Sequence, residues 1–280
     1  MKAQRRGITE QAVASFAGTL DPRLRELLTG LTGGLHQIVR QLRPTLAEWE
    51  ALVAFLTEVG QRSDDKRQEF ILLSDVLGIS SLVEEVNGHA GGTPGTVLGP
   101  FHVRASPPRA LGDSIDETGR ADLAEVRGRV SSVDGTPLAN AVVDVWQSDD
   151  NGYYDVQQPG RQPEGNGRGL FRTDEDGSFW FRTVVPSEYP VPTDGPVGRL
   201  LAASRRHAYR PAHIHVICRA PGHEALTTHL FVAGSPYLDS DAVFAVNEDL
   251  IVEFTEATPD APRRAAVDLV LVPDATGGDS

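Results

Sequence analysis

Two histidines at alternate positions are the residues of this chain with the clearest capacity for chemistry. They stand in the segment Arg210-Pro-Ala-His-Ile-His-Val216. Because alternate side chains of a β-strand share a face, His213 and His215 would project together, with Cα atoms about 6–7 Å apart. Paired imidazoles flanked by Ile214 and Val216 are costly to bury unless something satisfies them. The pair therefore predicts either a metal site or two hydrogen-bonded core histidines.

Two histidines do not complete a metal site, and the remaining ligands could be acidic or phenolic. Glu224 and His229 follow the pair and would give a cupin-like set, although their spacing is wrong for that family. Tyrosines occur in Asn151-Gly-Tyr-Tyr-Asp155 and in Pro186-Ser-Glu-Tyr-Pro190. A phenol has a pKa of about 10 in water, but a trivalent iron beside it would lower that pKa and hold the tyrosinate at neutral pH. Taken alone, a tyrosine in either place is more often a packing residue.

The first third of the chain predicts helices, over residues 8 to about 88. The segment Thr45-Leu-Ala-Glu48 has capping-box spacing, and an apolar stripe follows as far as Gly60. Asp65 and Gln68 begin a second helix, which runs to Gly78. The following segment, residues 89–122, is rich in glycine and proline, so we expect an ordered connection there.

Short apolar runs separated by turns predict a β-sandwich over residues 123–275, followed by a frayed tail at 276–280. The expected strands span residues 125–132, 141–146, 179–184, 212–219, 226–232, 250–254 and 267–272. Cys218 falls on the strand face opposite the two histidines and is expected to be a small core residue. Residues 1–88, 89–122 and 123–275 are thus the predicted helical, connecting and β regions.

Composition limits the kinds of partner and compartment. Among the 280 residues, 26 Lys and Arg stand against 39 Asp and Glu, a formal net charge of −13, which disfavours nucleic acid and anionic membranes as partners. The single cysteine fits a reducing compartment, so the cytoplasm is expected. We find no apolar stretch of the roughly 20 residues needed to cross a bilayer.

Three segments together resemble the iron site of the intradiol ring-cleaving dioxygenases, in that family's order. They are Trp146-Gln-Ser-Asp-Asp-Asn-Gly-Tyr-Tyr154, Pro186-Ser-Glu-Tyr189 and Arg210-Pro-Ala-His-Ile-His215. The resemblance implies that one non-haem Fe(III) per subunit is held by Tyr154, Tyr189, His213 and His215, and that Tyr153 is not a ligand. It also implies a β-sandwich catalytic domain that opens an aromatic diol with O2 and needs no reduced cofactor.

The resemblance further implies two catalytic roles. Tyr189 would leave the metal and carry a substrate proton, while Arg210 would stabilise negative charge that develops on the ring. Residues 68–78 resemble the N-terminal dimerisation region of the catechol and hydroxyquinol branch, which implies a cytoplasmic homodimer through N-terminal helices that can also bind lipid.

Within that branch, residues 96–102, 194–202 and 228–232 are most similar to enzymes that cleave hydroxyquinol, 1,2,4-trihydroxybenzene, to 3-hydroxy-cis,cis-muconate and hence maleylacetate. His229 stands where catechol and protocatechuate enzymes have glutamine, beside the ligands. Asp75 would accept a hydrogen bond from the third hydroxyl, which catechol lacks. The resemblance implies these ring-pocket residues: Leu72, Asp75, Val97, Leu98, Gly99, Pro100, Phe101, Val191, Pro192, Arg210 and Val243.

Two alternatives remain open at this point. One keeps the enzyme class but makes catechol or chlorocatechol the substrate. The other is a non-enzymatic binding module, because residues 128–143 resemble the opening of transthyretin-like sandwich modules and a fold alone does not give function. A module of that kind has no reason to bring Tyr154, Tyr189, His213 and His215 together.

Overall fold

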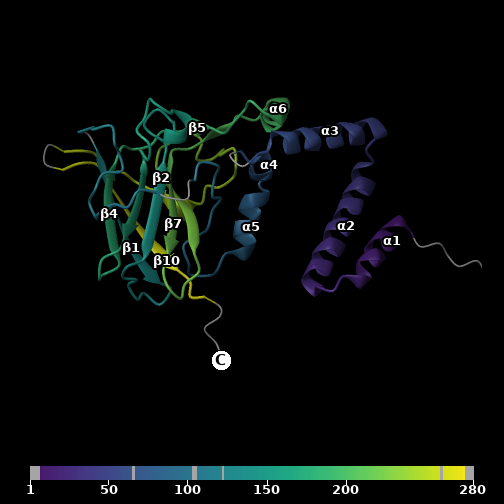
Figure 1. Cartoon of the computed structure of the whole chain (residues 1–280), viewed down its shortest axis with the longest axis horizontal. Coiled ribbons are helices and arrows are strands. Elements are labelled where there is room, and N and C mark those ends of the chain that lie inside the picture. Colours follow the sequence, from purple (N-terminus) through teal and green to yellow (C-terminus); the bar gives the residue numbers. More distant parts are fainter. Residues whose placement is uncertain (1–6, 65–66, 103–105, 122, 259–260, 275–280) are drawn as a thin grey trace, which may run out of the picture. The chain divides into compact units, whose positions relative to one another are not determined.

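The helices precede the strands along the chain in the computed structural model, which describes residues 7–64, 67–102, 106–121, 123–258 and 261–274. Packing divides the chain into two units, residues 1–58 and residues 59–280. Figure 1 shows the helices α1 to α3 in purple and blue and the strands in teal to yellow. No helix in the described part of the chain combines the length and the apolar composition of a membrane span.

The N-terminal helices begin at well-defined caps. They are α1 (Ile8–Ala14), the 3₁₀ turn η1 (Ser15–Gly18), α2 (Pro22–Leu42) and α3 (Leu46–Arg62). The Asp21 side chain accepts hydrogen bonds from the first backbone amides of α2, and Pro22 occupies the first helical position. The predicted capping box is confirmed: Glu48 N donates to Thr45 Oγ1 over 3.2 Å, and Thr45 N donates to Glu48 Oε2 over 2.7 Å.

Two further helices follow, α4 (Glu69–Val76) and α5 (Ile79–Asn87). Gly78 separates them with φ +72°, a left-handed conformation that glycine adopts without steric cost. Gln68 lies directly before the first residue of α4, as predicted, whereas the predicted start at Asp65 lies outside the described residues.

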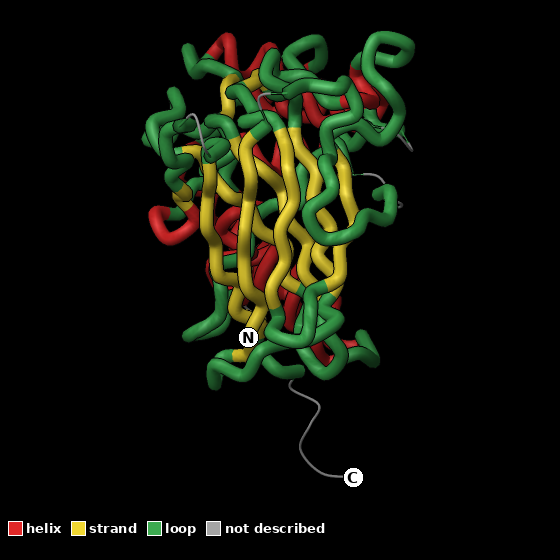
Figure 2. Tube along the Cα trace, turned by 90° about the vertical axis from the view of Figure 1, so that its left-hand side faces the viewer, coloured by secondary structure: helices red, strands yellow, loops and turns green. Residues whose placement is uncertain are grey.

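The strands form two main sheets, as predicted for a β-sandwich, and Figure 2 shows them running side by side with loops at their ends. One sheet has the order β10 (Arg264–Leu271), β1 (Ala124–Ser132) and β4 (Ser178–Thr183). The other has the order β3 (Arg168–Arg172), β2 (Val142–Gln147), β7 (His213–Arg219), β8 (Leu226–Val232) and β9 (Ile251–Val252). A short third pair joins β5 (Tyr189–Pro190) to β6 (Tyr209–Arg210).

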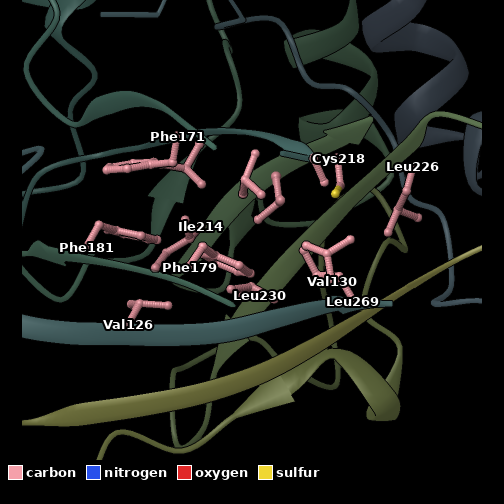
Figure 3. Packing of buried hydrophobic residues seen from close by; sticks show 14 of the residues in the cluster. Val126, Val130, Phe171, Phe179, Phe181, Ile214, Cys218, Leu226, Leu230 and Leu269 are labelled. Carbon is pink, nitrogen blue, oxygen red and sulfur yellow. The ribbon is translucent and has the colours of Figure 1, made fainter. Parts of the chain in front are cut away.

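The core lies between the two main sheets. Figure 3 shows Phe171, Ile214 and Leu230 of the larger sheet packed with Phe179 and Phe181 of the smaller one. Cys218 belongs to the same cluster, so its predicted place on the core face is confirmed. Side chains alternate along β7, and Ile214, Val216 and Cys218 face the core. The residues between them, His215 and Ile217, therefore point to the outer face of the larger sheet.

The structure contains elements that the apolar pattern did not indicate. The strand β3 and the helix α6 (Pro196–Ala203) were missed, and the predicted strand over 250–254 shortens to Ile251–Val252 after the 3₁₀ turn η3 (Glu248–Leu250). In β3, Gly169 interrupts the apolar pattern by which a strand is recognised. No side chain fits at this position, because a Cβ there would lie 2.6 Å from the Phe171 ring. At the start of α6, the dipeptide Gly195-Pro196 is typical of a loop in sequence. Proline nevertheless suits the first position of a helix, which Pro196 occupies here.

Candidate metal centre

The two histidines lie on the outer face of the larger sheet, at its middle strand. The register of β2, β7 and β8 places Trp146 and His229 directly opposite His215, one on each side. The indole of Trp146 stacks on the His215 ring with centroids 4.6 Å apart and planes 7° apart. His213, His215 and His229 are all buried, so the strand pattern creates a cluster of three imidazoles that water does not reach.

The two tyrosines reach this face from loops. Tyr154 immediately precedes the 3₁₀ turn η2 (Asp155–Gln157), and Tyr189 begins β5. Their loops pack backbone against backbone, since a Cβ on Gly152, which has φ +81°, would lie 2.7 Å from the carbonyl oxygen of Glu188. A side chain at Gly152 would therefore separate the loops that carry Tyr154 and Tyr189.

The four predicted ligands converge on one point. Tyr154 Oη donates to Tyr189 Oη over 3.2 Å, and Tyr189 Oη lies 3.3 Å from His213 Nε2. His213 Nε2 lies in turn 3.2 Å from His215 Nε2. Tyr153, next to one of these residues, is instead 47% exposed. The structure thus brings together two phenolic oxygens and two imidazole nitrogens from separate segments.

The donor geometry fits a metal ion. His213 Nδ1 lies 2.7 Å from the carbonyl oxygen of Pro211, which can accept its proton and leave the Nε2 lone pair directed at the cluster. Two nitrogens bound to one ion at about 2.1 Å lie about 3.0 Å apart when the bonds are perpendicular. The observed separation of 3.2 Å is close to this value. Hard oxygen donors combined with imidazoles suit iron.

The two phenols need a nearby cation to ionise, because burial disfavours their charged form. Burial is the main cause of their shifted pKa values. It raises the pKa of Tyr154 well above its usual value, and the adjacent Tyr189 raises that pKa further. Burial likewise raises the pKa of Tyr189, against the lowering effect of the Arg210 charge. Burial lowers the pKa values of His213 and His215, so both imidazoles are neutral at pH 7 and available as ligands.

A buried ion pair stabilises the loop that carries Tyr154. Arg168 donates to Asp155 Oδ1 through Nε over 2.9 Å and through Nη2 over 2.7 Å. Asp155 Oδ2 accepts a hydrogen bond from Gly165 N, which fixes the carboxylate from its other side. Because Asp155 follows Tyr154 directly, this pair holds the phenol against the sheet.

A cavity of about 600 Å³ adjoins the centre. Of the predicted pocket residues, it is lined by Leu72, Asp75, Gly99, Pro100, Phe101 and Pro192. Phe101 connects the cavity to the centre, because its ring stacks on Tyr154 with centroids 4.5 Å apart. The lining does not include five other predicted residues: Val97, Leu98, Val191, Arg210 and Val243. Of these five, Leu98 is 46% exposed.

Asp75 is one of the buried acidic groups that line this cavity. It is buried, and its Oδ1 atom has no hydrogen-bond partner among the described residues. Burial raises its pKa, while a hydrogen bond from Ser80 and the charge of Arg210 act in the opposite direction. A carboxylate oxygen without a partner beside an aromatic-sized cavity can accept a hydrogen bond from a ligand hydroxyl.

Sequence patterns did not identify several cavity residues: Arg67, Gln68, Glu69, Ile71, His102, Val156 and Gln157. They come from the start of α4 and the two residues before it, from η2, and from the segment before residue 103, which only the tertiary fold brings together. Their one sequence signal is proximity to predicted residues such as Leu72 and Phe101. Glu224 of the cupin-like set lies elsewhere, 3.0 Å from His89 Nε2.

Gly99 is expected to be intolerant of any side chain. It has φ +75°, and a Cβ there would lie 2.8 Å from His215 Cε1. We expect Gly99→Ala to displace the His215 ring and to lower iron affinity by about 10–100-fold, as changes around a ligand typically do. Iron release to a chelator measures this. Gly91→Ala is the matched control, since Gly91 has φ +86° but nothing near its Cβ position. Equal iron release from the two variants would contradict the packing argument.

Comparisons with known proteins agree with this arrangement. The family described as "Dioxygenase" matches residues 106–273, and "Catechol dioxygenase N terminus" matches residues 21–92. The chain is 48% identical to a hydroxyquinol 1,2-dioxygenase of Rhizobium sp. (strain MTP-10005), over 91% of this chain and 86% of that protein. It is 47% identical to a 6-chlorohydroxyquinol 1,2-dioxygenase of Cupriavidus pinatubonensis, over 95% and 96%.

Solved structures show the same fold. Hydroxyquinol 1,2-dioxygenase from Pseudomonas putida DLL-E4 has a TM-score of 0.87 and 43% identity, covering 95% of this chain and 98% of that one. Catechol 1,2-dioxygenase from Acinetobacter sp. ADP1 has a TM-score of 0.81 and 28% identity, covering 99% and 95%. This chain therefore belongs to the intradiol ring-cleavage dioxygenases, a family of non-haem iron enzymes. Within the family it is of the hydroxyquinol type.

Proposed function

We propose that this enzyme cleaves hydroxyquinol with O2 between its two adjacent oxygenated carbons, giving 3-hydroxy-cis,cis-muconate and hence maleylacetate. The convergence of Tyr154, Tyr189, His213 and His215 beside the cavity is the observation that carries the proposal. These four residues would hold one Fe(III) per subunit. When bound, ferric iron supplies Lewis-acid activation of the diol.

The chain's own residues have distinct roles in this proposal. Tyr154, His213 and His215 stay as anchors, held by the ion pair behind Tyr154 and by the strand register. Tyr189 takes a substrate proton at Oη, which lies within hydrogen-bonding distance of Tyr154 Oη and His213 Nε2. Arg210 stabilises negative charge on the ring, because its guanidinium is buried and always charged.

Asp75 supports hydroxyquinol over catechol as the substrate. Its unpartnered Oδ1 can accept the third hydroxyl, and a site built around such a bond discriminates against analogues that lack it. Leu72, Pro100 and Phe101 supply apolar walls for the ring. Four residues that do not line the cavity remain proposed ring-pocket residues on the family resemblance: Val97, Leu98, Val191 and Val243.

Catechol is the second candidate substrate. The chain is 36% identical to a catechol 1,2-dioxygenase of Candida albicans, over 88% of this chain and 83% of that protein. The apolar part of the cavity would accept a ring with or without a third hydroxyl.

Turnover of hydroxyquinol, catechol and 4-chlorocatechol, compared side by side on iron-loaded protein, tests the proposed function. We expect hydroxyquinol to have the highest kcat/KM of the three substrates. The protein should contain close to one iron per chain and show a broad visible charge-transfer band from tyrosinate bound to ferric iron. A colourless iron-loaded protein would contradict the two-tyrosine ligand set. A higher kcat/KM for catechol would contradict the substrate assignment alone.

We also propose a cytoplasmic homodimer formed through the N-terminal helices, with lipid able to bind there. Apolar side chains at helical spacing are exposed along α2: Leu24, Leu27, Leu31, Leu35, Ile38 and Leu42. Leu31→Glu should give a monomer in light scattering, whereas Gln37→Glu, on another face of α2, should leave the dimer intact. A dimer that persists in Leu31→Glu would place the interface elsewhere, and lipid extraction followed by mass spectrometry tests lipid binding.

A further inference from the structure

Arg210 is a buried cation placed among imidazoles. It is 2% exposed, and its Nη1 lies 3.2 Å from His213 Nε2 and 3.4 Å from His229 Nε2. His229 is held from its other side, because its Nδ1 hydrogen-bonds to the Thr96 hydroxyl. Neither imidazole carries a negative charge, so this guanidinium needs a counter-charge to be stable inside the protein.

Asp241 supplies that counter-charge. Its side chain is 2% exposed, and Arg210 donates to Oδ1 through Nε over 3.2 Å and to Oδ2 through Nη2 over 3.4 Å. The two contacts use the edge of the guanidinium that faces away from the imidazoles. Nη1 is left free to point at the metal-facing nitrogens, so the direction of the charge is set by which edge Asp241 occupies.

Asp241 is itself held firmly. Its Oδ1 accepts a hydrogen bond from Val243 N over 3.3 Å, and its Oδ2 accepts one from Ala245 N over 3.1 Å. The next residue, Ala242, donates from its backbone to Tyr209 O over 3.1 Å, which ties this loop to the strand that carries Arg210. The carboxylate is therefore a fixed point against which the guanidinium is oriented.

We propose that Asp241 is the positioning residue for Arg210 in ring cleavage, an inference that rests on the proposed function. The Nε2 lone pair of His213 can serve either the guanidinium or a metal ion, but not both. Once His213 serves as a ligand, Asp241 is the acid that holds Arg210, with His229 and Tyr189 also beside the guanidinium. Asp75, the other acid that interacts electrostatically with Arg210, is not hydrogen-bonded to it among the described contacts.

Two measurable consequences follow for Asp241→Asn. The guanidinium loses its fixed direction, and a misplaced group of this kind costs up to about 100-fold in rate, so kcat should fall about 10- to 100-fold with KM within about threefold. The unbalanced positive charge beside the ligands should also weaken iron binding about tenfold, which iron release to a chelator measures. The charge-transfer band should keep its position, because the ligands are unchanged.

The decisive experiment is a double-mutant cycle of Asp241→Asn and Arg210→Gln. If Asp241 acts through Arg210, the double variant should have the kcat of Arg210→Gln within about threefold. The control is Glu125→Gln, which removes the charge of a paired carboxylate in the other sheet and should keep the wild-type kcat and iron release. Should Asp241→Asn fail to fold, the double variant, which leaves no buried charge unpaired, is compared with Arg210→Gln alone.

Each outcome decides the inference. Losses in kcat that multiply in the double variant would show that Asp241 acts independently of Arg210 and would overturn the proposal. Wild-type kcat and iron release in Asp241→Asn would overturn it as well. An inactive, colourless wild-type protein under iron-replete conditions would instead contradict the proposed function. Failure of the Asp241 proposal and failure of the proposed function are therefore distinguishable.

Discussion

Tyr154→Phe is expected to lose bound iron and ring cleavage together. Changes around a metal ligand typically cost about 10–100-fold in affinity, and removal of a ligand atom should cost more than that. The Phe side chain keeps the stacking on Phe101, so the fold should survive while the phenolic donor is lost. Iron content, the visible spectrum and hydroxyquinol turnover measure the three quantities on one sample.

The neighbouring tyrosine provides a matched control. Tyr153→Phe removes an identical hydroxyl from a side chain that is 47% exposed, and it should leave iron, colour and turnover unchanged. His215→Ala should repeat the loss seen for Tyr154→Phe. Full iron and full turnover in Tyr154→Phe would show that the ligand assignment is wrong, even though the family assignment would stand.

Asp75→Asn is expected to shift substrate preference from hydroxyquinol toward catechol. Asparagine keeps an acceptor oxygen but loses the charge, and a hydrogen bond to a neutral acceptor is about 1–1.5 kcal/mol weaker than one to a charged acceptor, so the ratio of kcat/KM for hydroxyquinol to that for catechol should fall about 5–10-fold. Glu85→Gln, which neutralises an exposed acid on α5, is the control and should keep the ratio. An unchanged ratio in Asp75→Asn would remove the basis for the substrate assignment.

The same substitution has a pH signature in stability. Burial raises the pKa of Asp75 in the folded protein above the unfolded value of about 4. A raised folded pKa means that the stability contributed by the protonated acid is fully present below the unfolded pKa and is lost as pH rises through the folded pKa. Asp75→Asn should therefore raise Tm at pH 7 relative to wild type, and the difference should shrink toward pH 4.

Periodicity predicted the parts of the site that depend on a single strand. The alternation around His213 and His215 placed both rings on one face, and the core side chains between them, such as Ile214, confirm that phase. The turn residues Asn151 and Gly152 correctly indicated a turn before Tyr154, whereas Tyr189 begins the short strand β5. Which tyrosine of the pair at 153 and 154 would point inward came from the family resemblance, because loop geometry has no fixed period.

The groups that support the site were not predictable in this way. Arg168 and Asp155 are polar residues in a short strand and a 3₁₀ turn, and their burial depends on the pairing of β2 with β3. Asp241 lies 31 residues from the arginine it contacts, in a loop without a repeating pattern. Long-range pairing of charges inside a protein leaves no local signal, so such residues become visible only in three dimensions.

The strand β7 serves the hydrophobic core with Ile214, Val216 and Cys218 and the metal centre with the two histidines between them. A slip of one residue against β2 would exchange the two sets, turning both imidazoles into the interior and the aliphatic chains toward the ligands. A misaligned molecule could not take up iron at all. At saturating iron, the colour of the protein should therefore report the fraction of molecules whose central strand has paired correctly, so the visible absorbance would serve as an assay of folding.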